Sequence, residues 1–312
     1  MKQKIIVFAL LLVLLAGCGP KSVPATPTST PTSTAIPTAT ASATPTPKPT
    51  DENRELTVDG MQRTYLIHIP ASLDLGQPIP LVFAFHGYQE TPDLMKTLSD
   101  FNKVADQNGF IVIYPAGSGD SDFLSWNAGG CCGYAVSNNV DEAAFVRQMI
   151  ADVGTLATVD TRRIYATGFS NGALLSFRLA CEMSDTFAAI APVAGAVMTK
   201  DPCQPQQPVS VLQVHGMADT TVPFEGGYSS YSRLTFPSVA DSLSIWTQKD
   251  GCTGTPQEVK DGKVTHIVYP GCSAGLGVEL YKIDGLSHTW PLDTKVLMSA
   301  TIWDFFAAHP KP

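Results

Sequence analysis

The hydrophobic pattern of the chain changes near residue 53. From there on, short apolar runs of strand length alternate with longer segments in which apolar residues recur every three or four positions. We expect strands at 55–58, 62–69, 81–85, 110–114, 163–167, 188–193, 209–214, 264–269 and 278–283, and helices at 91–108, 141–157, 171–183, 237–249 and 295–308. Antiparallel strands followed by repeated strand–helix units predict an α/β fold with a mostly parallel central sheet and helices on both faces.

The amino end has a different pattern, which is typical of an export signal. Two lysines precede an apolar run at residues 5–16, which is too short to span a bilayer. The run ends in Leu15-Ala16-Gly17-Cys18, which resembles the lipobox of bacterial lipoproteins. We therefore expect a signal peptide at 1–17 and lipidation of Cys18, with an ordinary secretory signal and a chance cysteine as the alternative.

A stalk without a core is expected between this signal and the folded domain. Residues 20–50 contain 8 Pro and 10 Thr, a composition that favours extended polyproline-like chain. We therefore assign 18–52 to a lipidated, disordered stalk and 53–312 to one folded domain. The organisation predicts a lipoprotein held on the cell-envelope surface through a membrane anchor, and a monomer.

Composition excludes some functions for the domain. The chain is 44% hydrophobic and only 15% charged, against about 25% charged in typical soluble domains, so disorder throughout is excluded. Without the residues before 53, the domain retains 16 basic and 26 acidic residues, a net charge of −10. A nucleic-acid partner is not expected, because phosphate binding requires a basic surface.

Six cysteines remain besides Cys18, and an even number in an exported domain favours disulfides. Zinc is the competing interpretation, but no CxxC pair is present, and we expect no metal site. Cys131 and Cys132 are adjacent, and a bond between them would close a strained ring. We therefore expect a Cys252–Cys272 pair, with Cys181 and Cys203 each bonded to one member of the vicinal pair.

The sequence Gly168-Phe169-Ser170-Asn171-Gly172 falls between an expected strand and an expected helix. Glycines two positions before and after a serine permit the sharp turn and the close strand–helix approach of a nucleophile elbow. The alternative is a turn that serves packing alone. The placement favours Ser170 as a nucleophile.

A serine hydroxyl needs a base to remove its proton. Of the six histidines, only His288 lies in a loop after the last expected strand, and the order Ser…acid…His is typical of α/β hydrolases. Asp219 follows the strand 209–214 and would orient and stabilise the imidazolium, whereas Asp284 is the competitor close to His288 in sequence.

The oxyanion of a tetrahedral intermediate requires two preorganised donors. We expect one to be the backbone N–H of Asn171, at the positive end of its helix, and the other that of Tyr88 in His86-Gly87-Tyr88. The alternative for the second segment is a simple turn. Both donors are main-chain groups, so the side chains at 88 and 171 should be free to vary.

Several stretches together resemble the esterase family that contains polyhydroxybutyrate depolymerases and bacterial feruloyl and acetyl-xylan esterases. They are Val58-Asp59-Gly60 with Arg63 and Tyr65, Phe85-His86-Gly87, Ser125-Trp126-Asn127 running into Cys131-Cys132, Val140-Asp141, Arg163-Ile164-Tyr165 to Asn171-Gly172, Leu179-Ala180-Cys181-Glu182, and His288-Thr289-Trp290-Pro291. Glu142 stands where a second aspartate is expected, a departure outside the triad that should not affect the chemistry.

The resemblance implies an α/β-hydrolase fold and a serine ester hydrolase without a cofactor. It matches Ser170, Asp219 and His288 to the triad. The implied substrates are feruloyl or acetyl esters of plant polysaccharide, or hydroxyalkanoate esters. Because no separate polymer-binding domain is recognised, efficient attack on solid polyester is not expected.

Two tryptophans, Trp126 and Trp290, are candidates for the wall of the acyl pocket, with core packing as an equal alternative. Two other classes of function remain possible at this point. One is a serine peptidase of the same fold, and the other is a non-catalytic surface-binding protein that kept the fold.

Overall fold

The computed structural model describes residues 50–121, 123–292 and 298–312. The chain divides into two compact units, Met1–Pro45 and Thr46–Pro312, and the fold below is that of the second. The expected signal peptide, Cys18 and nearly all of the stalk lie outside the described residues. Within the described residues, no helix is long and apolar enough to cross a membrane.

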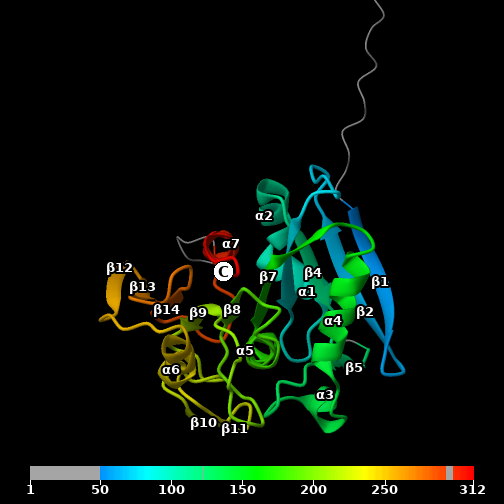
Figure 1. Cartoon of the computed structure of the whole chain (residues 1–312). Helices are drawn as coiled ribbons and strands as arrows, with labels where there is room; N and C mark the ends of the chain where they lie inside the picture. Colours follow the sequence, from blue (N-terminus) through cyan, green and yellow to red (C-terminus); the bar gives the residue numbers. More distant parts are fainter. Residues whose placement is uncertain (1–49, 122, 293–297) are drawn as a thin grey trace, which may run out of the picture. The chain divides into compact units, whose positions relative to one another are not determined.

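One sheet of ten strands forms the centre of the described fold, in the spatial order β1-β2-β4-β3-β7-β8-β9-β14-β13-β12 (Figure 1). The strands are β1 Thr50–Val58, β2 Met61–Ile69, β3 Ile79–Phe85, β4 Ile111–Pro115, β7 Val159–Phe169, β8 Ala189–Val193, β9 Ser210–Gly216, β12 Gln257–Asp261, β13 Val264–Tyr269 and β14 Val278–Ile283. The helices are α1 Pro92–Ser99, α2 Phe101–Asn108, α3 Gly133–Ser137, α4 Glu142–Val153, α5 Asn171–Glu182, α6 Val239–Lys249 and α7 Met298–Ala308.

The middle of the sheet is parallel and its edges are antiparallel. Strands β4, β3, β7, β8, β9 and β14 are parallel to one another. The pairs β1–β2, β2–β4, β14–β13 and β13–β12 are antiparallel. This confirms the predicted α/β class. The carboxyl ends of parallel strands lie at one edge of a sheet, so the loops that follow β3, β7, β9 and β14 share that edge.

Side chains of a strand alternate between the two faces of the sheet, so a strand of apolar residues presents apolar side chains on both faces. Helices cover both faces and bury them. In β3, Leu81, Phe83 and Phe85 pack into one apolar core with residues of α4, α5 and α6. Val82 and Ala84 pack into a second core with residues of α1, α2 and α7. All five side chains are fully buried, as expected for a strand at the centre of a three-layer fold.

The structure differs from the predicted elements at several places. The expected helix 91–108 is two helices, because Asp100 takes a left-handed conformation at φ 51° between α1 and α2. Strand β1 begins at Thr50, three residues before the expected start of the domain, and the Asp51 carboxylate lies 2.6 Å from His68 Nδ1. The predicted start of the last helix falls in residues 293–297, outside the described residues.

Short elements that sequence patterns did not indicate complete the fold. Strand β12 is exposed at every position, so it carries no apolar alternation. Two small hairpins, β5 (Ser118–Asp120) with β6 (Phe123–Ser125) and β10 (Gly227–Ser229) with β11 (Leu234–Phe236), lie outside the main sheet.

Three disulfides connect the six cysteines. Cys252 pairs with Cys272, as predicted. The predicted bonds from Cys181 and Cys203 to the vicinal pair are wrong: these two bond to each other, with their Cα atoms 5.3 Å apart. The end of α5 and the loop after β8 lie close together, which lets Cys181 and Cys203 bond to each other. Cys131 and Cys132 are bonded to each other.

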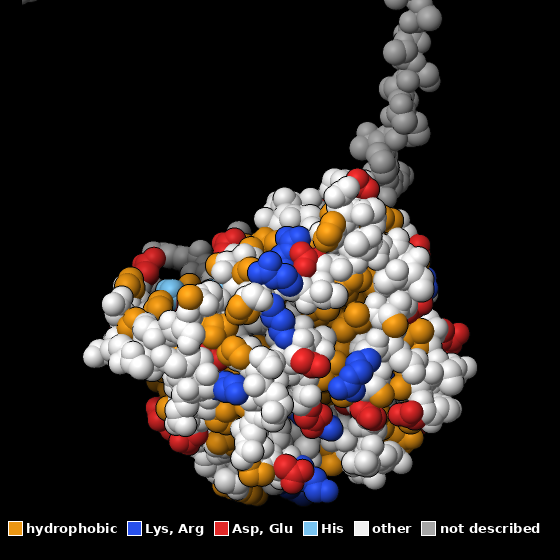
Figure 2. All heavy atoms as spheres, in the orientation of Figure 1, with side chains coloured by type: hydrophobic (Ala, Val, Ile, Leu, Met, Phe, Trp, Pro, Cys, Tyr) orange, Lys and Arg blue, Asp and Glu red, His pale blue; other side chains and the backbone are white. Residues whose placement is uncertain are grey.

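Charged side chains on the surface are mixed in sign. On the face shown in Figure 2, acidic and basic side chains are interspersed, with hydrophobic side chains between them. The ion pair between Lys260 and Asp284 is exposed on both sides, and such pairs contribute little to stability. The pair between Arg63 and Glu142 differs, because both side chains are almost completely buried.

Candidate active site

Ser170 occupies a sharp turn between β7 and α5. Its backbone angles, φ 54° and ψ −117°, are rarely adopted by residues with a side chain. The turn is fixed by a 3.0 Å hydrogen bond from the Ser170 N–H to Val193 O at the end of β8. A Cβ atom at Gly172 would lie 2.6 Å from His86 O, so only glycine permits this approach of helix and strand.

His288 reaches Ser170 from the loop that follows β14. Its Nε2 atom lies 2.8 Å from Ser170 Oγ, and its ring packs against Phe169 with 5.0 Å between the ring centroids. The loop is held to β9, since the N–H of Ala218 donates to Leu286 O at 3.0 Å. Ser170 and His288, which are 118 residues apart in sequence, are thereby brought together.

Asp219 lies on the other side of the imidazole. Its Oδ2 is 2.7 Å from His288 Nδ1, and its Oδ1 accepts 2.9 Å hydrogen bonds from the N–H groups of Thr221 and Val222. The competing Asp284 instead accepts a 2.7 Å hydrogen bond from Lys260 at the surface. The structure therefore brings Ser170, His288 and Asp219 together and leaves Asp284 outside the site.

The surroundings of Asp219 keep its carboxylate ionised. Burial alone raises its pKa, but hydrogen bonds from His215 and His288 and from the N–H of Val222 outweigh burial and hold the pKa well below the usual range. His215 is itself buried and donates from Nε2 to Val222 O at 2.8 Å. A permanently charged acceptor is therefore present at His288 Nδ1.

The remaining histidines have other partners. His68 lies between Asp51 and Asp106, His266 contacts Glu279, and His309 is next to the Phe305 carbonyl. Within the described residues, only His288 contacts Ser170.

The two residues expected to supply the oxyanion hole both line the cavity that contains Ser170. Asn171 is the first residue of α5, and the first N–H groups of a helix have no partner within it. Around Tyr88, the N–H of Gly87 donates to Glu90 Oε2 and that of Gln89 to Leu124 O, both at 2.8 Å. These bonds fix the loop on both sides of Tyr88, and both Tyr88 and Asn171 line the cavity at Ser170.

His86 stabilises this loop as a neutral, hydrogen-bonded side chain. It is fully buried, and burial lowers its pKa to about 4. Its Nε2 accepts a 3.0 Å hydrogen bond from the N–H of Gly117, so its Nδ1 carries the proton and donates to Gly87 O at 2.7 Å. These contacts give His86 a structural role in the loop.

The two tryptophans do not form the pocket wall, and this expectation is corrected. Trp126 is fully buried, donates from Nε1 to His86 O at 2.9 Å and packs on the ring of Phe85. Trp290 packs edge-on against Phe101 and lines a different hollow, beside α2. Trp126 belongs to the apolar core on one face of the sheet and Trp290 to the core on the other face.

The cavity at Ser170 has a volume of about 750 Å³, within the usual range for small-molecule sites. Its walls combine polar residues with apolar and aromatic residues, among them Phe169 next to His288. The lining residues are Tyr88, Gln89, Glu90, Gly130, Cys131, Cys132, Gly133, Val136, Ser137, Phe169, Ser170, Asn171, Leu174, Thr221, Val222, Tyr231, Ser232, Leu234, Phe236 and His288.

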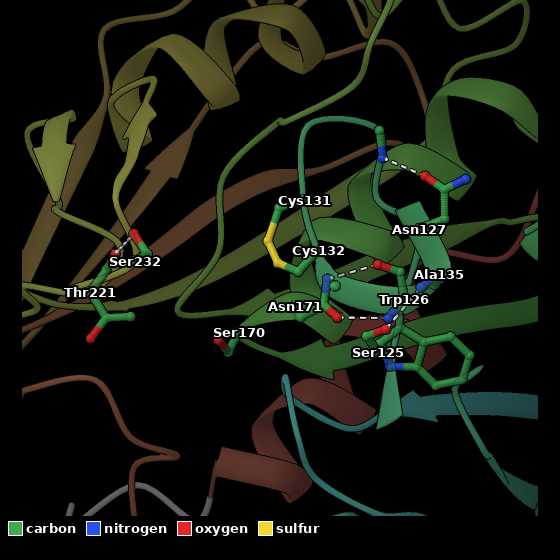
Figure 3. Close-up of a disulfide and its surroundings, with 12 residues drawn as sticks. Ser125, Trp126, Asn127, Cys131, Cys132, Ala135, Ser170, Asn171, Thr221 and Ser232 are labelled. Carbon is green, nitrogen blue, oxygen red and sulfur yellow. Dashed lines mark hydrogen bonds between the residues drawn. A yellow bond between two sulfur atoms is a disulfide. The ribbon is translucent and has the colours of Figure 1, made fainter. Parts of the chain in front are cut away.

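Sequence reasoning missed the side chain of Asn171. Its Oδ1 accepts a 2.7 Å hydrogen bond from the Trp126 N–H, and its Nδ2 donates to Trp126 O at 3.2 Å (Figure 3). The amide thus fastens the nucleophile turn to the 125–133 segment. The Asn171 side chain thus has a structural contact of its own, in addition to the role expected for its main-chain N–H.

Glu142 has a larger structural role than expected. Its carboxylate accepts 3.0 Å hydrogen bonds from Arg63 Nη2 and from the N–H of Asn127, one residue after Trp126. Burial raises its pKa, although Arg63 and the Asn127 N–H oppose the effect. The Arg63 guanidinium also packs on the Phe145 ring, 4.0 Å from its centroid. Glu142 therefore supports the segment next to the site.

Glu90 is a titratable residue of the cavity that the sequence did not single out. Burial raises its pKa, and the N–H of Gly87 and the charge of His288 oppose the effect. Its carboxylate holds the Gly87 N–H as described above. Within the described residues, no cluster of three or more His, Cys, Asp or Glu side chains could hold a metal ion.

Comparisons with known proteins agree with this geometry. The model of a family described as "Esterase PHB depolymerase" matches residues 63–220, just over half of the chain. The chain belongs to this family of carboxylic ester hydrolases.

Two relatives and one solved structure illustrate the range of the similarity. Feruloyl esterase B of Piromyces equi is 29% identical over 72% of this chain and 42% of its own length. Poly(3-hydroxyalkanoate) depolymerase C of Paucimonas lemoignei is 26% identical over 72% of this chain and 58% of its own length. The chain thus spans about half the length of these relatives.

The structure of an acetyl xylan esterase from Aspergillus awamori superposes with a TM-score of 0.61 at 16% identity, covering 82% of this chain and 99% of that one. At this identity the likeness shows the fold, which is that of an α/β hydrolase.

Proposed function

We propose that the protein is an exported serine carboxylic ester hydrolase that works through an acyl-enzyme. The observation that carries the proposal is the continuous hydrogen-bonded chain from Ser170 Oγ through His288 to Asp219, at the wall of an open cavity. Each member comes from a loop at the carboxyl ends of β7, β14 and β9, the edge at which α/β folds place their sites.

In this mechanism, His288 Nε2 removes the proton of Ser170 Oγ as the oxygen attacks the ester carbonyl. The ionised Asp219 carboxylate stabilises the imidazolium that forms and keeps the proton of the neutral ring on Nδ1. The alcohol leaves with the proton from Nε2. Water then enters, His288 removes its proton, and the acyl-enzyme is hydrolysed to the free acid and Ser170.

The oxyanion accepts hydrogen bonds from the N–H groups of Asn171 and Tyr88 in this proposal. Both groups are held in place before substrate binds, the first by the start of α5 and the second by the bonds on each side of Tyr88. Preorganised donors of this kind are usually worth a factor of about 100 to 1,000 in turnover each.

We propose feruloyl or acetyl esters of plant polysaccharide, or hydroxyalkanoate esters, as the substrates. The names of the two relatives include both feruloyl esters and a polyhydroxyalkanoate, and the cavity has room for an aromatic or a short aliphatic acyl group.

The test is a panel of methyl ferulate, acetylated xylan and polyhydroxybutyrate with the full chain, with Ser170→Ala as the control. We expect hydrolysis of at least one substrate, abolished in the variant, and labelling of Ser170 by a fluorophosphonate probe. Cleavage of peptide anilides in preference to esters would instead indicate a peptidase. Absence of probe labelling in the folded wild type would contradict the catalytic proposal.

We also infer that the protein is anchored at the cell-envelope surface through Cys18. Three disulfides support a location outside the reducing cytoplasm. Replacing Cys18 with serine should move the protein from the membrane fraction to the medium. An unchanged distribution between the two fractions would contradict the lipid anchor.

A further inference from the structure

The vicinal disulfide lies in the wall of the proposed catalytic cavity. Both Cys131 and Cys132 line the cavity that contains Ser170 and His288. In Figure 3 the disulfide is drawn above Ser170 and Asn171, with Thr221 and Ser232 farther to the left. The mechanism proposed above uses neither sulfur atom.

The local sequence makes the two sulfur atoms the main side-chain feature of this wall. It reads Gly129-Gly130-Cys131-Cys132-Gly133, so the flanking positions present only backbone. The space beside the flanks is occupied: a Cβ at Gly130 would lie 3.0 Å from Met198 O, and one at Gly133 would lie 2.7 Å from the Tyr88 ring. A side chain at either flanking glycine would therefore collide with Met198 or Tyr88.

The disulfide belongs to an apolar part of the cavity wall. Cys131 packs in one cluster with Leu174, Val222 and Phe236, and Cys132 and Leu234 pack against that cluster. All six residues line the cavity. A group that packs on the disulfide therefore also meets apolar side chains.

The wall is fixed relative to the nucleophile. The two hydrogen bonds of the Asn171 amide join the elbow to Trp126, and the N–H of Cys132 donates to Trp126 O at 3.0 Å. On the far side, the N–H of Gly130 donates to Met198 O. A surface held in this way can discriminate between bound groups, because it does not move aside to accommodate them.

The proton path determines which part of an ester meets the disulfide. The departing alcohol takes its proton from His288 Nε2, so the alcohol oxygen must lie near that atom. The acyl group is attached on the other side of the attacked carbonyl carbon and extends away from His288 Nε2. Sulfur is polarisable and makes favourable contacts with aromatic rings, so an apolar or aromatic acyl group suits this wall.

We propose that the Cys131–Cys132 disulfide is a specificity-determining surface on which the apolar or aromatic part of the acyl group packs. This inference rests on the proposed esterase function. It predicts that removal of the sulfur atoms affects esters of large acyl groups and leaves esters of small acyl groups nearly unchanged.

The first experiment measures kcat/KM for the double variant Cys131→Ala/Cys132→Ala on two ester series. Methyl acetate, methyl butyrate, methyl cinnamate and methyl ferulate vary the acyl group, whereas methyl acetate and phenyl acetate vary the alcohol. The matched control is Cys252→Ala/Cys272→Ala, which removes a disulfide that does not line the cavity.

We expect the vicinal variant to lose about threefold to tenfold in kcat/KM on the cinnamate and ferulate esters, with the acetates changed less than about twofold. The control variant should change all esters alike. An equal loss on every ester, no loss on any, or a selective loss on phenyl acetate would overturn the proposal. Inactivity of the wild type on the whole panel would instead reject the esterase function.

A second measurement does not depend on the folding of a cysteine variant. The Ser170→Ala protein, with all cysteines intact, is reduced under mild conditions with and without saturating methyl ferulate, and the alkylated cysteines are counted by mass spectrometry. The bound ester should slow reduction of Cys131–Cys132 and leave Cys252–Cys272 unaffected, whereas methyl acetate should protect neither. Equal reduction rates with and without methyl ferulate would contradict the contact.

Discussion

The pKa values of two buried aspartates, Asp219 and Asp250, are shifted in opposite directions, and their surroundings explain the difference. Asp219, at the site, accepts hydrogen bonds from two backbone N–H groups and contacts two histidines, which hold its pKa well below the usual range. Asp250, at the end of α6, is fully buried, and within the described residues no hydrogen bond of good geometry reaches either carboxylate oxygen.

Burial raises the pKa of Asp250 to about 7, and the N–H of Val209 and the charge of Lys249 offset only part of this effect. Its position at a helix carboxyl end, which is electrostatically negative, also disfavours ionisation. Burial is common to both aspartates, so burial alone does not mark a functional acid. Donors directed at the carboxylate distinguish the one beside His288.

The largest expected effect concerns Asp219. Replacing it with asparagine removes the charge and lets the amide favour the wrong imidazole tautomer, so we expect kcat to fall by about 10,000-fold. The measurement is turnover of an aryl acetate at saturating concentration. Asp284→Asn is the matched control and should retain normal turnover, because its carboxylate pairs with Lys260 at the surface. The reverse outcome would assign the acid to Asp284.

A third buried carboxylate, that of Glu142, tests how much the hydrogen-bond donors around a buried carboxylate contribute to the stability of the fold. Glu142→Gln leaves the Arg63 guanidinium buried without its counter-charge, and we expect a loss of about 3 to 5 kcal/mol in the free energy of unfolding. Urea denaturation measures it. The control Glu182→Gln removes the more exposed pair with Arg178 and should cost no more than about 0.5 kcal/mol. Equal losses in the two variants would refute this distinction.

Asp250 should make stability depend on pH. Its folded pKa of about 7 lies above the ordinary value of 3.8, so between these values the folded state binds more protons than the unfolded state. Its contribution to the free energy of unfolding is therefore full below pH 4 and declines as the pH rises to 7. From pH 5 to pH 8 the loss should be about 3 kcal/mol, and Asp250→Asn should abolish it.

Urea denaturation of wild type and variant at both pH values gives this difference directly. Identical pH dependence of the two proteins would show that Asp250 ionises normally in the folded state.

The smallest expected change in the free energy of unfolding concerns Ser170. Its positive φ is an unfavourable conformation for a residue with a side chain, so Ser170→Gly should raise the free energy of unfolding by about 1 kcal/mol while abolishing turnover. Ser170→Ala keeps a Cβ and should not share the gain. Equal stability of the two variants would indicate that the turn stores no strain at this residue.

The sequence indicated the candidate triad because each member carries a local signal. Ser170 lies between glycines at a strand–helix junction, and Asp219 and His288 each follow a buried strand. Parallel pairing brings these strand ends to one edge of the sheet, so their order along the chain was enough to propose that they meet. The structure brings them into hydrogen-bonding distance, and their catalytic role remains our proposal.

The features that sequence could not predict depend on contacts between distant segments. The partners of Cys181 and Cys203 follow from how α5 packs on the loop after β8, and the burial of Trp126 follows from its bond to His86 O. The side chain of Asn171 gives no sign in the sequence that it binds Trp126. The exposed strand β12 lacks apolar alternation, which is the signal that strand prediction uses.

The parallel pairing of β9 with β14 has a consequence for the order in which the protein becomes active. During synthesis, Ser170 is made long before His288, and the loop that carries His288 is positioned only when β14 adds to β9. Contacts of such long sequence separation form late in folding. A partly synthesised chain should therefore present a serine without its base, and ester hydrolysis would report completion of the whole sheet rather than formation of the elbow.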